Sequence, residues 1–368
     1  PLVAGGVWER IRPTVRFVFE AVVVSASVQL WLLPLMAVYF HRIPVAGIVL
    51  NIWTGGLVAA MGILAVPALS LGSIADVLAM PFVAAAEAAS AAAVWGSRAV
   101  LGVGLGGMRM PVYSGAGVAI YFLYLVPVAA LAVMLFRWDP FRIKPDAKLR
   151  ITSKRGLVAA AVLIMLGLAS LIIFTPFAAP DPDGRLRVDL LDVGQGDAAL
   201  ITFPNGETML IDAGGQVDYR TDAEGDEDFE PDRARIGEMV VSEFLWERGL
   251  SHVDHIVASH ADSDHLQGLI DVARNFSVGR AYFAEAQGET EESQMLYAIL
   301  AERGVAAERL VDGEAMTVGG VRVDVLYPAA NASPSLAEND RSLVLMLTVG
   351  ERRFLFTGDI EAEAERLL

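Results

Sequence analysis

Long, uninterrupted apolar runs fill the first half of the chain. A membrane-spanning helix needs about 20 mostly apolar residues, and four runs reach this length: Val15–Phe40, Ile43–Leu69, Ala116–Phe136 and Gly156–Phe177. A fifth run, Ile74–Trp95, is rich in alanine and contains Asp76 and Glu87, so it fits either a span or an amphipathic helix at the membrane surface. The length and number of these runs predict a multi-pass α-helical membrane domain rather than the core of a large soluble protein.

Polar and basic residues add detail to this domain. Polar groups are costly within a bilayer, so each of the polar residues in the runs either bonds to another helix or lines a polar path: Glu20, Gln29, Asn51 and Glu87. The loop from Arg137 to Arg155 holds seven Lys and Arg residues. Cytoplasmic loops are enriched in such residues, so we expect this loop in the cytoplasm and the chain after Phe177 on the extracytoplasmic side. The orientation of the first spans depends on whether Ile74–Trp95 crosses.

From Arg185 onward, short apolar segments replace the long runs. They predict strands at 187–193, 198–203, 208–212, 253–258, 280–283, 321–327, 342–348 and 353–357, and helices at 236–248, 266–275, 291–303 and after Asp359. This mixture predicts an α/β sandwich of sheets covered by helices. A proline-rich segment precedes it, so we expect a membrane domain at residues 1–178, a linker at 179–185 and a soluble domain at 186–368.

Charge changes sharply along the chain. Residues 1–178 carry 13 Lys and Arg against 6 Asp and Glu, a net charge of +7, whereas residues 179–368 carry 15 against 38, a net charge of −23. The chain has no cysteine, which excludes disulfides, thiolate metal sites and a cysteine nucleophile. Any transition-metal site must therefore use carboxylates and the five histidines. Of these histidines, we expect His252 and His255 to be structural or exposed and His41 to be interfacial.

The segment His260-Ala-Asp262-Ser-Asp264-His265 follows a predicted buried strand and holds four such side chains. Catalytic divalent ions use about three protein ligands and leave a position open for water, and two ions ~3.5–4 Å apart stabilise both oxygens of an in-line displacement. The alternative is a polar helix cap formed by Asp262 or Asp264. Two histidines and two aspartates exceed what a cap needs, so the segment predicts a metal site.

Two further aspartates end predicted strands. Asp212 precedes Ala213-Gly-Gly215 and either supports the site or is an ordinary turn residue. Asp359, in Thr357-Gly-Asp359, either bridges two ions or caps a helix. A glycine-rich turn that lacks the spacing of a nucleotide-binding loop contributes three more polar side chains: Asp192, Gln195 and Asp197.

The motifs follow one another in a recognisable order: Asp192–Asp197, Asp212-Ala-Gly214, His260–His265, Asn339-Asp-Arg-Ser-Leu-Val-Leu345 and Thr357-Gly-Asp359. As a set they resemble the metallo-β-lactamase domain of the DNA-internalisation competence proteins of the ComEC type. The preceding helices are similar to the membrane competence domain of that family, in Ser27-Val-Gln-Leu, Leu33-Pro34 and Val49-Leu-Asn51-Ile. The resemblance implies an αββα sandwich for the soluble domain.

The resemblance also implies a function. The family forms an inner-membrane channel that admits one DNA strand during transformation, and the attached domain is proposed to be a nuclease that degrades the other strand. The implied partners are DNA, the lipid bilayer and other DNA-uptake proteins, and an oligomer is compatible with the family.

The resemblance assigns roles to individual residues. The implied metal ligands are His260, Asp262, Asp264, His265 and Asp359, and Asp264 is the candidate to orient a metal-bound water or accept its proton. The supporting residues are Asp192, Gln195, Asp197, Asp212, Asn339 and Ser342. Asp262 stands where the general pattern has histidine, and oxygen there should shift preference from zinc towards manganese or magnesium. We expect two divalent ions, manganese or zinc, with magnesium as a third option.

The chain departs from the family in two ways. The family continues after Gly-Asp with a His-His-Gly-Ser element, and this chain ends before it. In the family, an oligonucleotide-binding-type domain and early spans precede the corresponding helices, and we do not find them in this sequence. The resemblance therefore implies an incomplete metal site in this stretch of sequence.

Two other functions stay open. One is a membrane hydrolase of another substrate class, such as a lactonase or a phospholipid hydrolase. The other is a transport protein whose metallo-β-lactamase-like domain is inactive, since a fold alone does not choose between activities. A DNA-binding surface is normally basic, so the charge of −23 on residues 179–368 counts against DNA binding by the soluble domain. The DNA path would then run through the basic membrane half.

Overall fold

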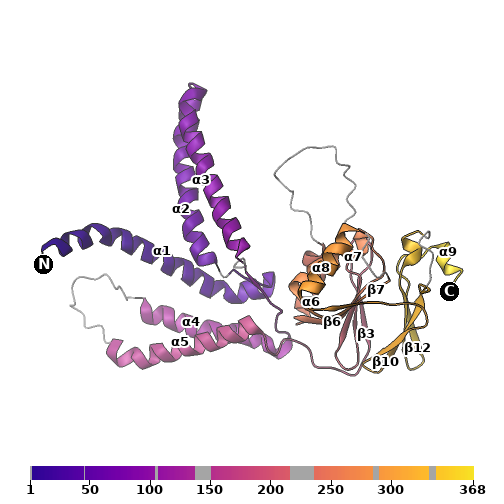
Figure 1. Cartoon of the computed structure of the whole chain (residues 1–368). Coiled ribbons are helices and arrows are strands. Elements are labelled where there is room, and N and C mark those ends of the chain that lie inside the picture. Colours follow the sequence, from indigo (N-terminus) through magenta and orange to yellow (C-terminus); the bar gives the residue numbers. More distant parts are fainter. Residues whose placement is uncertain are drawn as a thin grey trace. The chain divides into compact units, whose positions relative to one another are not determined.

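A computed structural model describes residues 2–44, 46–103, 107–136, 151–215, 236–284, 290–330 and 337–368. Within this part, the chain forms two compact units, Pro1–Pro176 and Phe177–Leu368, shown as ribbons in Figure 1. Most of the basic loop 137–155 and the acidic residues 218–232 lie outside the described residues.

The first unit is built from helices. They are α1 (Leu2–Phe40), α2 (Gly47–Gly72), α3 (Asp76–Gly102), α4 (Ala119–Leu135) and α5 (Ile151–Phe174). A two-residue ladder pairs β1 (Arg42–Ile43) with β2 (Met108–Arg109), and a 3-10 turn, Gly115–Val118, precedes α4. Five helical stretches in the described residues are long and apolar enough to cross a membrane by length and composition: Glu9–Phe40, Gly47–Gly72, Asp76–Gly102, Gly115–Leu135 and Arg155–Phe174.

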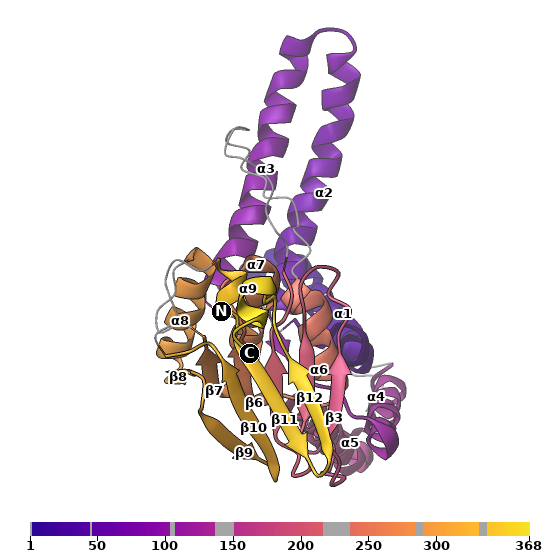
Figure 2. The same ribbon diagram turned by 90° about the vertical axis from the view of Figure 1, so that its right-hand side faces the viewer.

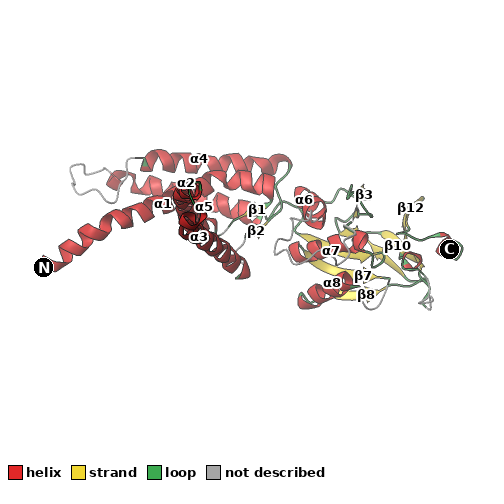
Figure 3. Cartoon of the chain, turned by 90° about the horizontal axis from the view of Figure 1, so that it is seen from above, coloured by secondary structure: helices red, strands yellow, loops and turns green. Residues whose placement is uncertain are grey.

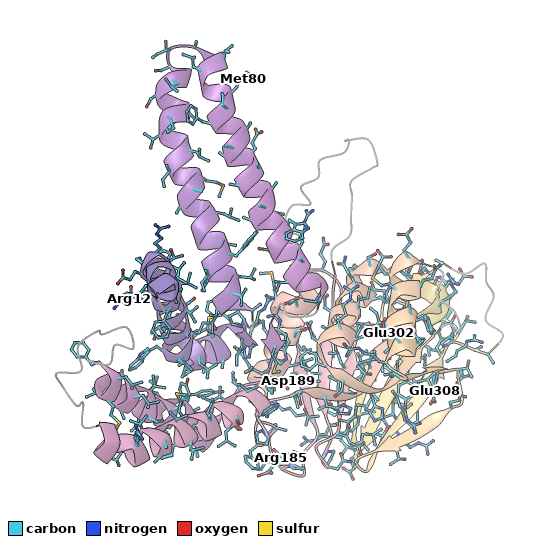
Figure 4. The ribbon with its side chains drawn as sticks, turned by 60° about the vertical axis from the view of Figure 1, so that its left-hand side comes forward. Arg12, Met80, Arg185, Asp189, Glu302 and Glu308 are labelled. Atoms are coloured by element: carbon cyan, nitrogen blue, oxygen red, sulfur yellow. The ribbon has the colours of Figure 1, made fainter. Side chains whose placement is uncertain are left out.

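Most of the ambiguous run Ile74–Trp95 forms the first part of α3, which begins at Asp76, continues to Gly102 and pairs with α2 as a hairpin (Figure 1). The indole nitrogen of Trp53 donates to the carbonyl of Ala92 at 3.2 Å across this hairpin. None of the side chains of α2 is buried. Figure 4 shows apolar side chains pointing outward from both helices, with Met80 labelled near the turn, as expected for a surface that meets lipid.

Polar contacts join the other helices of this unit. The amide of Asn51 on α2 donates to the hydroxyl of Ser25 on α1 at 3.2 Å, so for Asn51 the structure favours the helix-to-helix alternative. The Tyr124 hydroxyl on α4 donates to the Leu30 carbonyl on α1 at 3.0 Å, and the Tyr113 hydroxyl donates to the Leu171 carbonyl on α5 at 2.9 Å.

The second unit contains two sheets. The six-stranded sheet has the order β3 (Arg187–Leu190), β4 (Ala199–Thr202), β5 (Thr208–Ile211), β6 (His252–Ala258), β7 (Ser277–Phe283) and β8 (Ala306–Arg309). Its first three strands are antiparallel, and β5 to β8 run parallel. The antiparallel four-stranded sheet has the order β12 (Arg352–Phe356), β11 (Val344–Val349), β10 (Val321–Tyr327) and β9 (Ala315–Val318).

The six-stranded sheet is buried on both faces because successive side chains of a strand point to opposite sides. Leu200, Leu210 and Ile256 pack against a helical layer. Their neighbours Ile201 and Val257 pack against the four-stranded sheet. Figures 2 and 3 show the two sheets face to face and the helices on the far side of the larger one.

The helical layer consists of α6 (Glu243–Glu247), α7 (Ser263–Asn275) and α8 (Glu291–Glu302), and short α9 (Ala362–Glu365) packs on the other side, against β10 and β11. The order of layers is therefore helix, sheet, sheet, helix, which confirms the predicted αββα sandwich. Charged side chains such as those of Arg185, Asp189, Glu302 and Glu308 lie on this unit (Figure 4).

Several element boundaries differ from prediction. The structure adds β8 and β9, which were not predicted. Every residue of β8 is exposed and only Val318 of β9 is buried, so neither strand shows the apolar alternation that marks a strand. Helix α7 begins at Ser263 rather than Leu266. The helix predicted at 236–248 contains a π-helical turn, Gly237–Ser242, in which the Ser242 hydroxyl donates to the Gly237 carbonyl at 2.7 Å.

Candidate metal centre

The candidate site lies at the carboxyl end of β6, where parallel strands commonly present functional groups to a loop. Strand β6 ends at Ala258 and α7 begins at Ser263. His260 lies in the link between them, and His265 lies in the first turn of α7. Both histidines are buried, and their ring centroids are 4.3 Å apart. The short link thus forces two imidazoles to face each other.

Asp359 comes to the same point from the second sheet. It follows β12, and one ligand atom from each of His260, His265 and Asp359 lies within 4.8 Å of the others. The Oδ1 atom of Asp359 is 3.4 Å from Nε2 of His265, and its side chain is 42% exposed. The Leu343 amide donates to the Ser259 carbonyl at 2.8 Å, which ties the start of β11 to the histidine loop. Two buried nitrogens and one accessible carboxylate therefore surround one position.

The donor atoms fit a divalent ion. Nε2 of His260 and Nε2 of His265 are both buried and have no hydrogen-bond partner, and an unpaired buried polar atom is costly unless something else binds it. Imidazole nitrogen and carboxylate oxygen are ordinary ligands of such ions.

Asp212 supports His265 from the side opposite to this position. The Asp212 carboxylate is buried and accepts three hydrogen bonds: from the Ser259 amide at 2.8 Å, from the Ser259 hydroxyl at 2.6 Å and from Nδ1 of His265 at 3.1 Å. Its backbone has φ of 53°, a conformation that non-glycine residues rarely adopt. Asp212 is thus a buried carboxyl group that organises the loop, and its contacts exceed those of an ordinary turn residue.

The two histidines have different proton affinities. Burial lowers the pKa of His265, but the hydrogen bond and charge of Asp212 outweigh it, together with the charges of Asp359 and Asp264, and raise that pKa to about 9. Burial and the neighbouring His265 lower the pKa of His260. Because a metal ligand must be unprotonated, ion binding has to displace a proton from His265, so affinity should rise with pH.

The other two aspartates of the segment lie close by but outside the three-residue cluster. Oδ2 of Asp262 is 3.5 Å from Nε2 of His260. Asp262 occupies the N-cap position of α7, yet its side chain makes no capping hydrogen bond. Asp264 lies in the first turn of α7 and is half-buried. Asp359 does not cap α9, because Glu361 holds that N-cap position.

Apart from Asp212, the predicted supporting residues divide into two groups. Asp192, Gln195 and Asp197 are exposed in their turn. That turn nevertheless touches the site, since the Gly214 amide donates to the Asp197 carbonyl at 3.0 Å. A Cβ on Gly196 would collide with the Asp264 carbonyl.

The second group lies near Asp359. The hydroxyl of buried Ser342 accepts a hydrogen bond from the Asp359 amide at 3.3 Å. Asn339 instead donates to Glu361 at 3.4 Å, so its described contact is with a residue outside the cluster.

Sequence reasoning missed two residues of this region. Ser259 contacts both Asp212 and His260, and its place directly before His260 is the signal that could have revealed it. Asp340 is buried and accepts from the amides of Glu361 and Ala364 at 2.9 and 3.2 Å, which stabilises the chain that follows Asp359. No local pattern marks Asp340, since its partners lie more than twenty residues away.

Comparison with known proteins divides the chain into two matched regions. Residues 5–137 match the family described as "Competence protein", and residues 191–368 match the "Metallo-beta-lactamase superfamily". The chain is similar to ComE operon protein 3 of Bacillus subtilis (strain 168), with 28% identity over 219 residues. That match covers 58% of this chain and 27% of the relative, so the chain spans only about a quarter of the relative's length.

Similar solved structures include CmlA, a diiron β-hydroxylase from Streptomyces venezuelae, with 18% identity and a TM-score of 0.28 over 56% of this chain and 35% of that chain. Another is the metallo-β-lactamase fold protein YhfI from Bacillus subtilis, with 11% identity and a TM-score of 0.28 over 45% of this chain and 55% of that chain.

Proposed function

Because residues 5–137 match the competence-protein family and residues 191–368 match the metallo-beta-lactamase superfamily, we propose that the chain is an inner-membrane protein of DNA uptake with a metal-dependent phosphodiesterase unit. The observation that carries the hydrolase part is the convergence of the Asp359 carboxylate and two buried Nε2 atoms that have no hydrogen-bond partner. The DNA part rests on the competence match and on the five apolar helices.

The residues of the site have different proposed roles in ion binding, orientation and proton transfer. His260, His265 and Asp359 would hold a divalent ion, with Asp262 and Asp264 available for a second one. A bound ion would supply a water of lowered pKa as the nucleophile. Asp212 orients His265, and Asp264 is the proposed residue that orients the water or accepts its proton. We propose manganese or zinc, with magnesium as the third option, because both nitrogen and oxygen ligands are present.

Charge suggests where DNA would run. Residues 179–368 carry a net charge of −23 and residues 1–178 carry +7, and phosphate backbones are attracted to basic surfaces. We therefore place the transported strand on the helical unit. The second unit, on the extracytoplasmic side, would meet the strand that is not transported, and only its metal centre would offer local positive charge.

Cleavage assays test this proposal. The protein in detergent micelles is incubated with single- and double-stranded DNA, with Mn²⁺ or Zn²⁺ or with a chelator. We expect metal-dependent cleavage that falls at least ~100-fold in His265→Ala, since losing even a residue that supports a ligand costs about 10- to 100-fold. Asp264→Asn should also lower the rate, while His255→Ala, which alters a partly buried histidine outside the cluster, should leave it unchanged.

The other outcomes distinguish the alternatives. Cleavage that is insensitive to chelator or to His265→Ala contradicts the proposed centre. Hydrolysis of a lactone or a phospholipid in place of DNA assigns the site to another hydrolase class. Metal binding without hydrolysis of any of these substrates indicates a transport protein with an inactive domain.

A further inference from the structure

Ser259 lies at the centre of the hydrogen-bond network behind the two histidines. Only 1% of its surface is exposed. Its hydroxyl is 2.6 Å from Oδ2 of Asp212 and 2.9 Å from Nδ1 of His260, and its amide donates to Oδ1 of Asp212 at 2.8 Å. Ser259 therefore connects a buried carboxylate to one imidazole of the cluster.

The proton positions in this network follow from counting donors. An ionised carboxylate only accepts hydrogen bonds, and a serine hydroxyl has one proton to donate. Asp212 accepts from three donors, so the Ser259 proton is directed to Asp212. Towards His260 the hydroxyl oxygen can then only accept, and Nδ1 of His260 must carry the proton.

We infer that Ser259 is a positioning residue that fixes His260 with its proton on Nδ1 and its lone pair on Nε2. This inference rests on the proposed function of the cluster as a metal site. Nε2 of His260 is buried and has no hydrogen-bond partner. The hydrogen bonds that lead from Asp212 through the Ser259 hydroxyl to Nδ1 of His260, here called the relay, leave the lone pair on this Nε2 atom, which faces Asp359 and His265. A ring with the other tautomer would present N–H to the ion and could not bind it.

One carboxylate thereby orients both rings. Asp212 reaches Nδ1 of His265 directly, at 3.1 Å, and reaches His260 only through the Ser259 hydroxyl. Partners of this kind fix the tautomer and ring orientation of a metal-binding histidine. Threonine retains a hydroxyl on the same carbon atom and should preserve the relay, whereas alanine removes it.

Two substitutions and a matched control test the inference. Ser259→Ala removes the relay and Ser259→Thr retains it. Ser277→Ala is the control, because the Ser277 hydroxyl contacts Nδ1 of His252 at 2.8 Å in the same way but outside the cluster. Each full-length protein in detergent is titrated with Mn²⁺ and Zn²⁺ by calorimetry. The tautomer of His260 is measured without metal by nitrogen-15 NMR of the five labelled histidines.

We expect Ser259→Ala to weaken metal binding about 10- to 100-fold and to shift His260 away from the Nδ1–H tautomer. Ser259→Thr should restore both properties, and Ser277→Ala should change neither. A thermal melt of each variant shows whether it is folded. If Ser259→Ala misfolds, the His260 tautomer of the wild type and the metal affinity of Ser259→Thr still test the inference.

Metal binding in Ser259→Ala equal to that of the wild type, or a wild-type His260 protonated on Nε2, overturns the inference while the proposed metal function stands. If the wild type binds neither ion, the proposed function fails. The His260 tautomer measured in metal-free protein then still shows whether Ser259 fixes the proton on Nδ1.

Discussion

His255 is a titratable residue on which burial and neighbouring charges act in opposite directions. It lies on β6 outside the metal cluster, with its ring stacked on Tyr282 at a centroid distance of 5.8 Å. Burial lowers its pKa below the usual value of 6.5, although the charges of Asp254 and Glu207 oppose this effect. The folded protein therefore keeps His255 neutral at a pH where the unfolded chain has taken up a proton.

The sign of the resulting pH dependence follows from proton linkage. Between the folded pKa and about 6.5 the unfolded state binds more protons, so stability falls as pH decreases through this window. We expect His255→Gln to lose less stability than the wild type between pH 7 and pH 5, measured by thermal unfolding in detergent. His252→Gln, on the same strand, should lose as much stability as the wild type between pH 7 and pH 5. A parallel decline in wild type and His255→Gln would show that His255 does not titrate in this way.

At the scale of elements, the strand and helix that carry the histidines could be predicted because their signals are local. Val253–Ala258 is a mostly apolar run in which Val253 and Ile256–Ala258 are buried, and α7 has a polar start. The edge strands β8 and β9 could not, because neither carries a repeating buried pattern. The proximity of Asp359 to His260 also could not be predicted from local sequence patterns. It depends on the pairing of β11 with β12 and on the hydrogen bond from Leu343 to Ser259.

The turn 192–197 offers a test of how closely such separate elements are packed. Gly194 and Gly196 both have positive φ, 80° and 68°, which strains any other residue by about 1–3 kcal/mol. A Cβ on Gly194 would meet no atom within 4 Å, but a Cβ on Gly196 would collide with the Asp264 carbonyl.

We expect Gly194→Ala to lower the free energy of unfolding by the strain alone. Gly196→Ala should cost a further ~1–3 kcal/mol through overpacking. It should also weaken Mn²⁺ binding, since Asp264 and the adjacent His265 must shift. Chemical denaturation and metal titration measure the two effects separately. Equal metal affinities in Gly194→Ala and Gly196→Ala would mean that the turn does not constrain the histidine loop.

At the scale of the whole molecule, membrane orientation depends on whether α3 crosses. Its length and its hairpin with α2 favour a crossing. If all five helices cross, four spans separate the arginines near the start of α1, Arg10, Arg12 and Arg16, from the basic loop 137–155. Both basic segments then lie on the same side, as the enrichment of such residues in the cytoplasm requires. If α3 stayed at the surface, the two basic segments would lie on opposite sides.

The absence of cysteine from the sequence makes this orientation directly measurable. Single substitutions Ser73→Cys, between α2 and α3, Ser114→Cys, before α4, and Ala179→Cys, after α5, are exposed to a membrane-impermeant maleimide in intact cells. With five crossings, Ser73→Cys should be protected until the cells are permeabilised, whereas Ser114→Cys and Ala179→Cys should react at once. Immediate labelling of all three would place α3 at the extracytoplasmic surface. Labelling of Ser73→Cys alone would invert the protein and put the candidate metal centre in the cytoplasm, where it could not meet the strand left outside.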